Sequence, residues 1–113
     1  MIEDYRLKFN QCAENLKRLG DMYAESKADS WYKQELKHSV LASVMNGLEG
    51  SISHRENAAR ASEDYLKHLV ETRDAIQKEL KLKSQYERQK FIFEGLRSIC
   101  SLEKHASEYE KTE

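Results

Sequence analysis

The sequence predicts an all-α protein with three main helices, of which the C-terminal one is long, arranged as a helical bundle or a coiled-coil oligomer. Its 113 residues contain no proline, where average usage would give about six. Charged residues make up 35% and hydrophobic residues 39% of the chain. This combination is typical of long helices and disfavours a β-sandwich or barrel, which needs turn residues at each corner. The length predicts a single domain over residues 1–113.

A first helix is predicted over about residues 2–25. Its apolar residues recur at alternating steps of three and four, which is the pattern of a coiled-coil seam. They are Ile2, Tyr5, Phe9, Cys12, Leu16, Leu19 and Tyr23. Gly20 is the expected weak point, because glycine lowers helix stability.

A second helix is predicted over about residues 30–48, with Asp29 or Ser30 as its N-cap. Its apolar residues follow at steps of four, which gives one wide hydrophobic face. They are Leu36, Val40, Val44 and Leu48. Gly47 and Gly50 are expected to end the helix.

Residues 49–61 are predicted to connect the second and third helices. Ser53 and Glu56 have the spacing of a capping box, in which each side chain satisfies the other residue's backbone N–H. Ser62, followed by two acidic residues, is the expected start of the third helix.

The third helix is predicted over about residues 62–107, followed by a frayed tail at 108–113. An unbroken helix of this length measures about 68 Å, whereas a compact domain of 113 residues is only about 34 Å across. At 100° per residue, the apolar face changes sides between Leu80 and Leu82. Either the helix breaks near residues 81–84, or its two halves face different partners. We favour the second interpretation, in which the later apolar residues contact another copy of the chain. This predicted oligomer interface comprises Leu82, Tyr86, Phe93, Leu96, Ile99 and Cys100.

The charges nearly cancel to a formal net charge of −1, so no global field points to a nucleic acid or a membrane. One stripe of the third helix is nevertheless basic, and its residues lie within about 80° of arc. Two arginines of the connector add positive charge. The predicted nucleic-acid-binding residues are Arg55, Arg60, Lys78, Lys81, Gln85 and Arg88. The stripe is either a phosphate-binding surface or an ordinary solvated face.

No catalytic motif is present in the sequence, so we expect a protein that is not an enzyme and needs no cofactor. Glu35 and His38 match the Glu-x-x-His spacing of di-iron bundles, but such sites need a second pair and two further glutamates. We therefore expect no metal site. Trp31 and Phe91 fit the apolar faces least well, which makes them candidates for base stacking or partner docking.

Several features of the sequence favour a cytoplasmic protein. Cys12 and Cys100 are expected to be free, buried thiols in a reducing compartment. The N-terminus lacks the basic start and apolar run of a signal peptide. No segment has the roughly 20 apolar residues that span a bilayer.

Part of the chain resembles small helical proteins encoded in the recombination modules of tailed phages. The resemblance covers about residues 36–104. It depends on Glu49-Gly50-Ser51, Arg55-Glu56, Ala59 and Ala61, Tyr65, and the segment Phe93-Glu94-Gly95-Leu96-Arg97. Some of these proteins are similar to the UvsY-type recombination mediator, an oligomeric helical protein that loads a recombinase onto single-stranded DNA. The resemblance implies a class of function and no particular site.

These observations together predict a phage accessory protein of DNA recombination or replication, located in the host cytoplasm. It would form homo-oligomers, bind single-stranded DNA, and contact a recombinase or a single-strand-binding protein. Two alternatives remain open: an inhibitor that binds a host nuclease or defence complex, and a coiled-coil adaptor.

Overall fold

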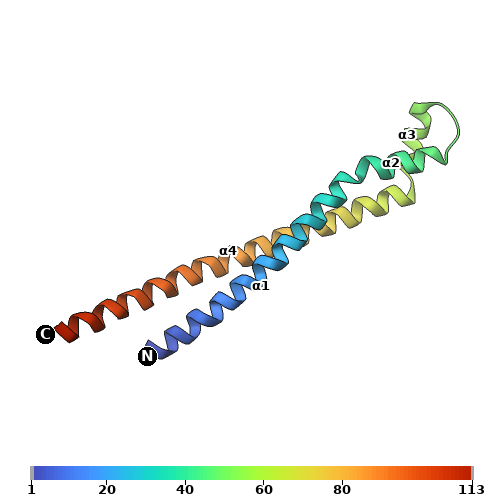
Figure 1. Ribbon diagram of the computed structural model, residues 1–113. Coiled ribbons are helices and arrows are strands. Elements are labelled where there is room, and N and C mark those ends of the chain that lie inside the picture. The colour runs from blue at the N-terminus through green and yellow to red at the C-terminus, as the bar shows by residue number, and fades with distance from the viewer. Residues whose placement is uncertain (1, 113) are drawn as a thin grey trace. The chain divides into compact units, whose positions relative to one another are not determined.

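The fold consists of helices throughout the part of the chain that the structure describes. A computed structural model describes the backbone of residues 2–112 and the side chains of residues 4–109. The helices are α1 (Ile2–Glu35), α2 (Lys37–Asn46), α3 (Ile52–Arg60) and α4 (Glu63–Thr112) (Figure 1). The prediction of an all-α fold with a long C-terminal helix is therefore confirmed. The chain divides into two compact units, one formed by Met1–Tyr23 with Leu82–Glu113 and the other by Ala24–Lys81. The predicted single domain stays a prediction.

The first helix is longer than predicted, and no second helix begins at residue 30. α1 continues to Glu35 and ends at a break at Leu36. Asp29, the predicted N-cap, instead forms an ion pair with Lys33 one turn later, at 3.2 Å. Ser30 lies within α1 and is fully buried, so it occupies a packing position and does not begin a helix.

The break at Leu36 is accompanied by a contact from α4. Leu36 N still donates to the Tyr32 carbonyl at 3.0 Å. The Lys33 carbonyl lies 3.0 Å from Nε2 of the buried His68. Because a carbonyl oxygen only accepts, the imidazole is the donor of this bond.

The connector folds differently from the predicted capping box. Ser51, and not Ser53, is the N-cap of α3: its hydroxyl accepts from His54 N at 3.2 Å. Gly50 precedes it with φ of 112°, a conformation that glycine adopts without strain. Glu56 pairs with Arg60 instead of closing a box.

The start of the long helix is as predicted, whereas its end is not. The Ser62 hydroxyl accepts from Tyr65 N at 3.2 Å and donates to the Ala59 carbonyl at 2.6 Å, which joins α3 to α4. α4 then runs without interruption to Thr112. The predicted fraying of residues 108–113 stays a prediction, and residue 113 lies outside the described residues.

In the first unit, α1 and α4 pack against each other in antiparallel directions. The rings of Phe9 and Phe93 stack with centroids 4.8 Å apart. Further along α1, Tyr23 lies 6.1 Å from Tyr86, ring centroid to ring centroid. Gly20 belongs to this contact, because a Cβ there would lie 3.3 Å from the Tyr86 ring. The predicted weak point is thus a place where the two helices approach closely.

The second unit has its own hydrophobic core, made where α2, α3 and the start of α4 meet. Its buried residues are Leu41, Ala59 and Tyr65. Apolar residues pack around them and are partly buried. These are Val40, Val44, Met45, Leu48 and Leu69.

The predicted change of face on α4 is wrong. From Tyr65 to Cys100, one series of buried and half-buried positions continues at steps of three and four residues. It comprises Tyr65, His68, Thr72, Ala75, Glu79, Leu82, Tyr86, Gln89, Phe93, Leu96 and Cys100, and half-buried Leu69, Ile76 and Ile99 lie next to members of the series. Counting apolar residues alone gives a false change of face, because polar and small side chains occupy several of these buried and half-buried positions. Leu66 and Leu80 lie outside the pattern and are exposed.

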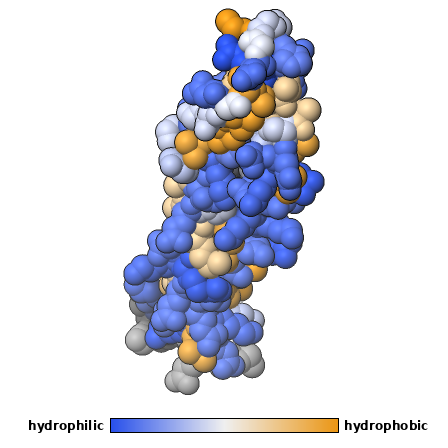
Figure 2. Space-filling model, turned by 90° about the vertical axis from the view of Figure 1, so that its right-hand side faces the viewer, coloured by the Kyte–Doolittle hydropathy of each residue, from blue (hydrophilic) through white to orange (hydrophobic). Residues whose placement is uncertain are grey.

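Most of the visible surface is hydrophilic. On the face shown in Figure 2, hydrophilic side chains dominate and hydrophobic ones form small separate patches. Isolated apolar residues of this kind are normal on a folded protein.

Candidate nucleic-acid interface

The predicted basic stripe is exposed on α4. Lys78, Lys81, Gln85 and Arg88 are all exposed to solvent. They follow one another along α4 at steps of three, four and three residues. Lys78 and Lys81 belong to the second unit, and Gln85 and Arg88 belong to the first. Within the described residues, none of the three cations forms an ion pair or a side-chain hydrogen bond. Their charges are therefore free to contact phosphate groups.

The two connector arginines differ from the α4 cations. Arg60 binds the Glu56 carboxylate through Nε at 3.3 Å and through its terminal nitrogen at 2.9 Å. This hydrogen bond raises the pKa of Arg60. Arg55 is half-buried, and its Nε is buried without a hydrogen-bond partner among the described residues. Neither arginine offers an unpaired, fully exposed charge, so the α4 stripe is the stronger part of the predicted site.

Two exposed aromatic residues stand apart from the hydrophobic packing, as the sequence predicts. Phe91 is 79% exposed and Trp31 is 64% exposed. Phe91 follows Arg88 by three residues on α4, and these two side chains therefore lie on neighbouring turns of the same face. Exposed rings beside cations are the side chains on which bases of single strands stack.

The residues predicted as an oligomer interface pack within a single copy of the chain. Phe93 stacks on Phe9, Tyr86 lies beside Tyr23, and Leu82 is buried. Leu96, Ile99 and Cys100 are half-buried on the same helix. One copy therefore leaves this stripe less exposed to water than the sequence predicts, because α1 contacts it at Tyr86 and Phe93. That these six residues contact another copy stays a prediction.

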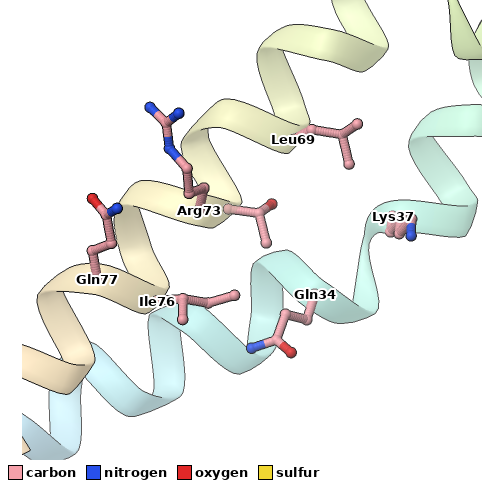
Figure 3. Close-up of a pocket in the computed structure, with 7 residues that line it drawn as sticks. Gln34, Lys37, Leu69, Arg73, Ile76 and Gln77 are labelled. Atoms are coloured by element: carbon pink, nitrogen blue, oxygen red, sulfur yellow. The ribbon is translucent and has the colours of Figure 1, made fainter.

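A recess in the second unit was not predicted from the sequence. It has a volume of about 460 Å³ and lies between the end of α1, the start of α2, and α4. Figure 3 shows Leu69 and Ile76 of α4 pointing toward the α1 side, while Arg73 points away. Gln34 and Lys37 line the opposite wall. The recess combines an apolar wall with polar side chains.

The two thiols are free and differ in burial. Cys12 is buried and Cys100 is half-buried. The Cys12 thiol donates to the Gln89 side-chain oxygen, with 3.3 Å between sulfur and oxygen. Burial raises the pKa of Cys12, so a smaller fraction of it is thiolate at neutral pH.

We expect Cys12 to react slowly with a thiol reagent. Because its pKa is raised, less of the nucleophilic thiolate is present, and its rate should keep rising at pH values where an ordinary thiol has levelled off. In Cys100→Ser protein at pH 8, Cys12 should react several-fold more slowly than in the same protein unfolded in urea. The rate of release of thionitrobenzoate from Ellman's reagent measures this. Equal native and unfolded rates would show that Cys12 is accessible.

Neither a metal centre nor a membrane span was found among the described residues. Side chains of His, Cys, Asp and Glu do not gather there in groups of three or more that could hold a metal ion. The described helices include none that is both long enough and apolar enough to cross a bilayer.

Comparison with known proteins identifies no relative: no family model, no curated protein and no solved structure matches this chain.

Proposed function

We propose that this chain is a non-enzymatic, DNA-binding accessory protein of phage recombination or replication that acts in the host cytoplasm. It binds single-stranded DNA through Lys78, Lys81 and Arg88, with Gln85 between them. The observation that carries this proposal is that these three cations are exposed and unpaired on one helix. The proposal includes self-association and contact with a recombinase or a single-strand-binding protein.

The proposed DNA contact is electrostatic and independent of base sequence. Cations along one helix neutralise successive phosphates and release counterions, which makes affinity fall as salt rises. Because the whole chain has a net charge of −1, binding by one copy is weak, and self-association strengthens it by repeating the stripe.

The test compares two triple variants by fluorescence anisotropy with a labelled oligothymidine. In Lys78→Gln/Lys81→Gln/Arg88→Gln protein, binding should weaken and the dependence of log K on log salt should flatten. For single strands each lost phosphate contact removes about 0.7 units of slope, so three lost contacts remove about 2.

The matched control removes the same number of charges from other exposed positions of α4. It carries Lys67→Gln, Lys83→Gln and Lys104→Gln, and it should keep a steeper salt dependence than the first variant. Circular dichroism checks that both variants remain helical. Equal loss in the two variants, or no binding of the oligothymidine by the unmodified protein at low salt, would refute the stripe as a DNA site.

A second candidate function is a protein-binding role, as an adaptor or an inhibitor. Trp31 and Tyr32 favour it: they are adjacent, and 64% and 58% exposed. Exposed Trp and Tyr side chains are the residue types that dominate binding energy at protein interfaces. This function requires that Trp31→Ala/Tyr32→Ala abolish binding to a purified protein partner while the stripe variant leaves that binding unchanged.

A further inference from the structure

We propose that two copies of this chain associate through the outer face of α4, which we define as Phe91, Gly95, Ser98 and Leu102. This inference rests on the self-association included in the proposed function and is independent of DNA binding. It assigns that association to a surface different from the one predicted from the sequence.

The outer face contains apolar side chains that are largely exposed among the described residues. Phe91 is 79% exposed and Leu102 is 68% exposed. The four residues follow at steps of four, three and four, which is the spacing of a packing seam. Phe93 lies on a different stripe of α4, where its ring already stacks on Phe9 of α1. One helix therefore carries two seams, and a single copy fills one of them.

Gly95 gives the second, independent observation. It lies in the middle of α4, and a Cβ placed there would meet nothing within 4 Å. Glycine destabilises a helix interior relative to alanine, and nothing inside one copy uses the missing side chain. A neighbouring helix backbone that approaches closely at this point would use it.

The arrangement of large and small residues fits a second copy of the same chain. When two outer faces meet in antiparallel directions, Phe91 lies opposite Leu102 of the other copy, and Gly95 lies opposite Ser98. The small residues then meet at the twofold axis and the large ones pair on both sides of it. Such a surface is complementary to itself, as a twofold interface between identical chains requires.

The immediate surroundings of these residues suit this pairing. One surface depression is lined by Glu87, Lys90, Phe91 and Glu94, a set with the spacing of a hole that receives a side chain in coiled coils. Another adjoins Leu102. The charges that border Gly95 are already neutralised within the helix, because Glu94 pairs with Arg97 at 2.7 Å. They therefore offer little repulsion to a second copy.

Sedimentation equilibrium over a range of concentrations tests the surface. The unmodified protein should dimerise, and Phe91→Glu or Leu102→Glu should raise the dimer dissociation constant at least tenfold. Leu7→Glu is the matched control: it introduces the same charge at a leucine of α1 that is 58% exposed, and it should leave the constant unchanged. Circular dichroism establishes that each variant is folded.

Gly95→Leu separates association from folding. Leucine is a better helix former than glycine, and the open space accommodates it in one copy, so this variant should unfold at a higher temperature when monomeric. It should nevertheless dimerise more weakly, because the added side chain keeps the second helix away.

Disulfide cross-linking then tests the direction of pairing, in protein carrying Cys12→Ser and Cys100→Ser. An antiparallel pair places Ser98→Cys of the two copies close together and Glu108→Cys far apart, so oxidation should link only the first. Linking at both positions would overturn the antiparallel arrangement. A monomer at all concentrations would overturn both the surface and the proposed self-association. A dimer insensitive to the Phe91, Leu102 and Gly95 variants would overturn the surface alone.

Discussion

Replacing Tyr65 by alanine should lower the free energy of unfolding by about 3–5 kcal/mol, the usual cost of removing a buried aromatic side chain. Tyr65 is 3% exposed and belongs to the buried cluster with Leu41 and Ala59. Its ring connects the first turn of α4 to α2 and α3. The deletion therefore leaves a cavity where three helices meet.

Urea unfolding followed by circular dichroism measures this loss. Leu66→Ala is the control, because Leu66 is the next residue of the same helix and is 48% exposed. Its cost should stay below about 1 kcal/mol. Similar costs for the two variants would contradict the packing described for the second unit. If Tyr65→Ala does not fold, Tyr65→Leu retains part of the volume and should show an intermediate loss.

Replacing Leu82 by alanine should cost about 2–5 kcal/mol, whereas Leu80→Ala should cost less than about 1 kcal/mol. The two leucines are two residues apart on α4, and Leu82 is 6% exposed while Leu80 is 57% exposed. The large difference is expected because only Leu82 is buried.

Thermal and urea unfolding of Leu82→Ala and Leu80→Ala, at the same protein concentration, measures the two losses in free energy of unfolding. Equal losses in the free energy of unfolding, or a larger loss for Leu80→Ala, would instead support the change of face on α4 that the apolar residues alone predict. Repeating the measurement at higher concentration separates folding from association, because dimerisation makes the unfolding midpoint depend on concentration.

The parts of the fold that follow apolar spacing are the parts that the sequence predicts well. The seam from Tyr5 to Tyr23 identifies the first half of α1, and residues 9 and 23 indeed face α4. Ser62, with acidic residues after it, correctly marks the start of α4. These elements are predictable because a local pattern and a local cap decide them.

The parts that were predicted wrongly depend on polar residues in packing positions. Ser26 and Ser30 are buried in α1, although serine is usually a sign of a helix end. His68 and Glu79 occupy the α4 seam, where apolar counting leaves a gap and then finds a false change of side. Only tertiary contacts, such as that between His68 and the Lys33 carbonyl, distinguish a buried polar residue from a solvated one.

The candidate site was predictable to a similar extent. Helical spacing alone predicts that Lys78, Lys81 and Arg88 lie along one side of α4, and all three are exposed. The pairing of Arg60 with Glu56 four residues earlier has a recognisable i, i+4 signature. The buried Nε of Arg55 has no such signature, because it depends on how the connector folds.

The hydrogen bond between His68 and the Lys33 carbonyl has a consequence for how α1 and α4 are aligned within the second unit. Aliphatic seams tolerate sliding by a heptad, since one leucine replaces another. An imidazole that must reach a single carbonyl has no equivalent partner seven residues away, so sliding would bury it unsatisfied. This hydrogen bond thus fixes the register of α1 against α4 within the second unit, because the shifted alignments would lose it.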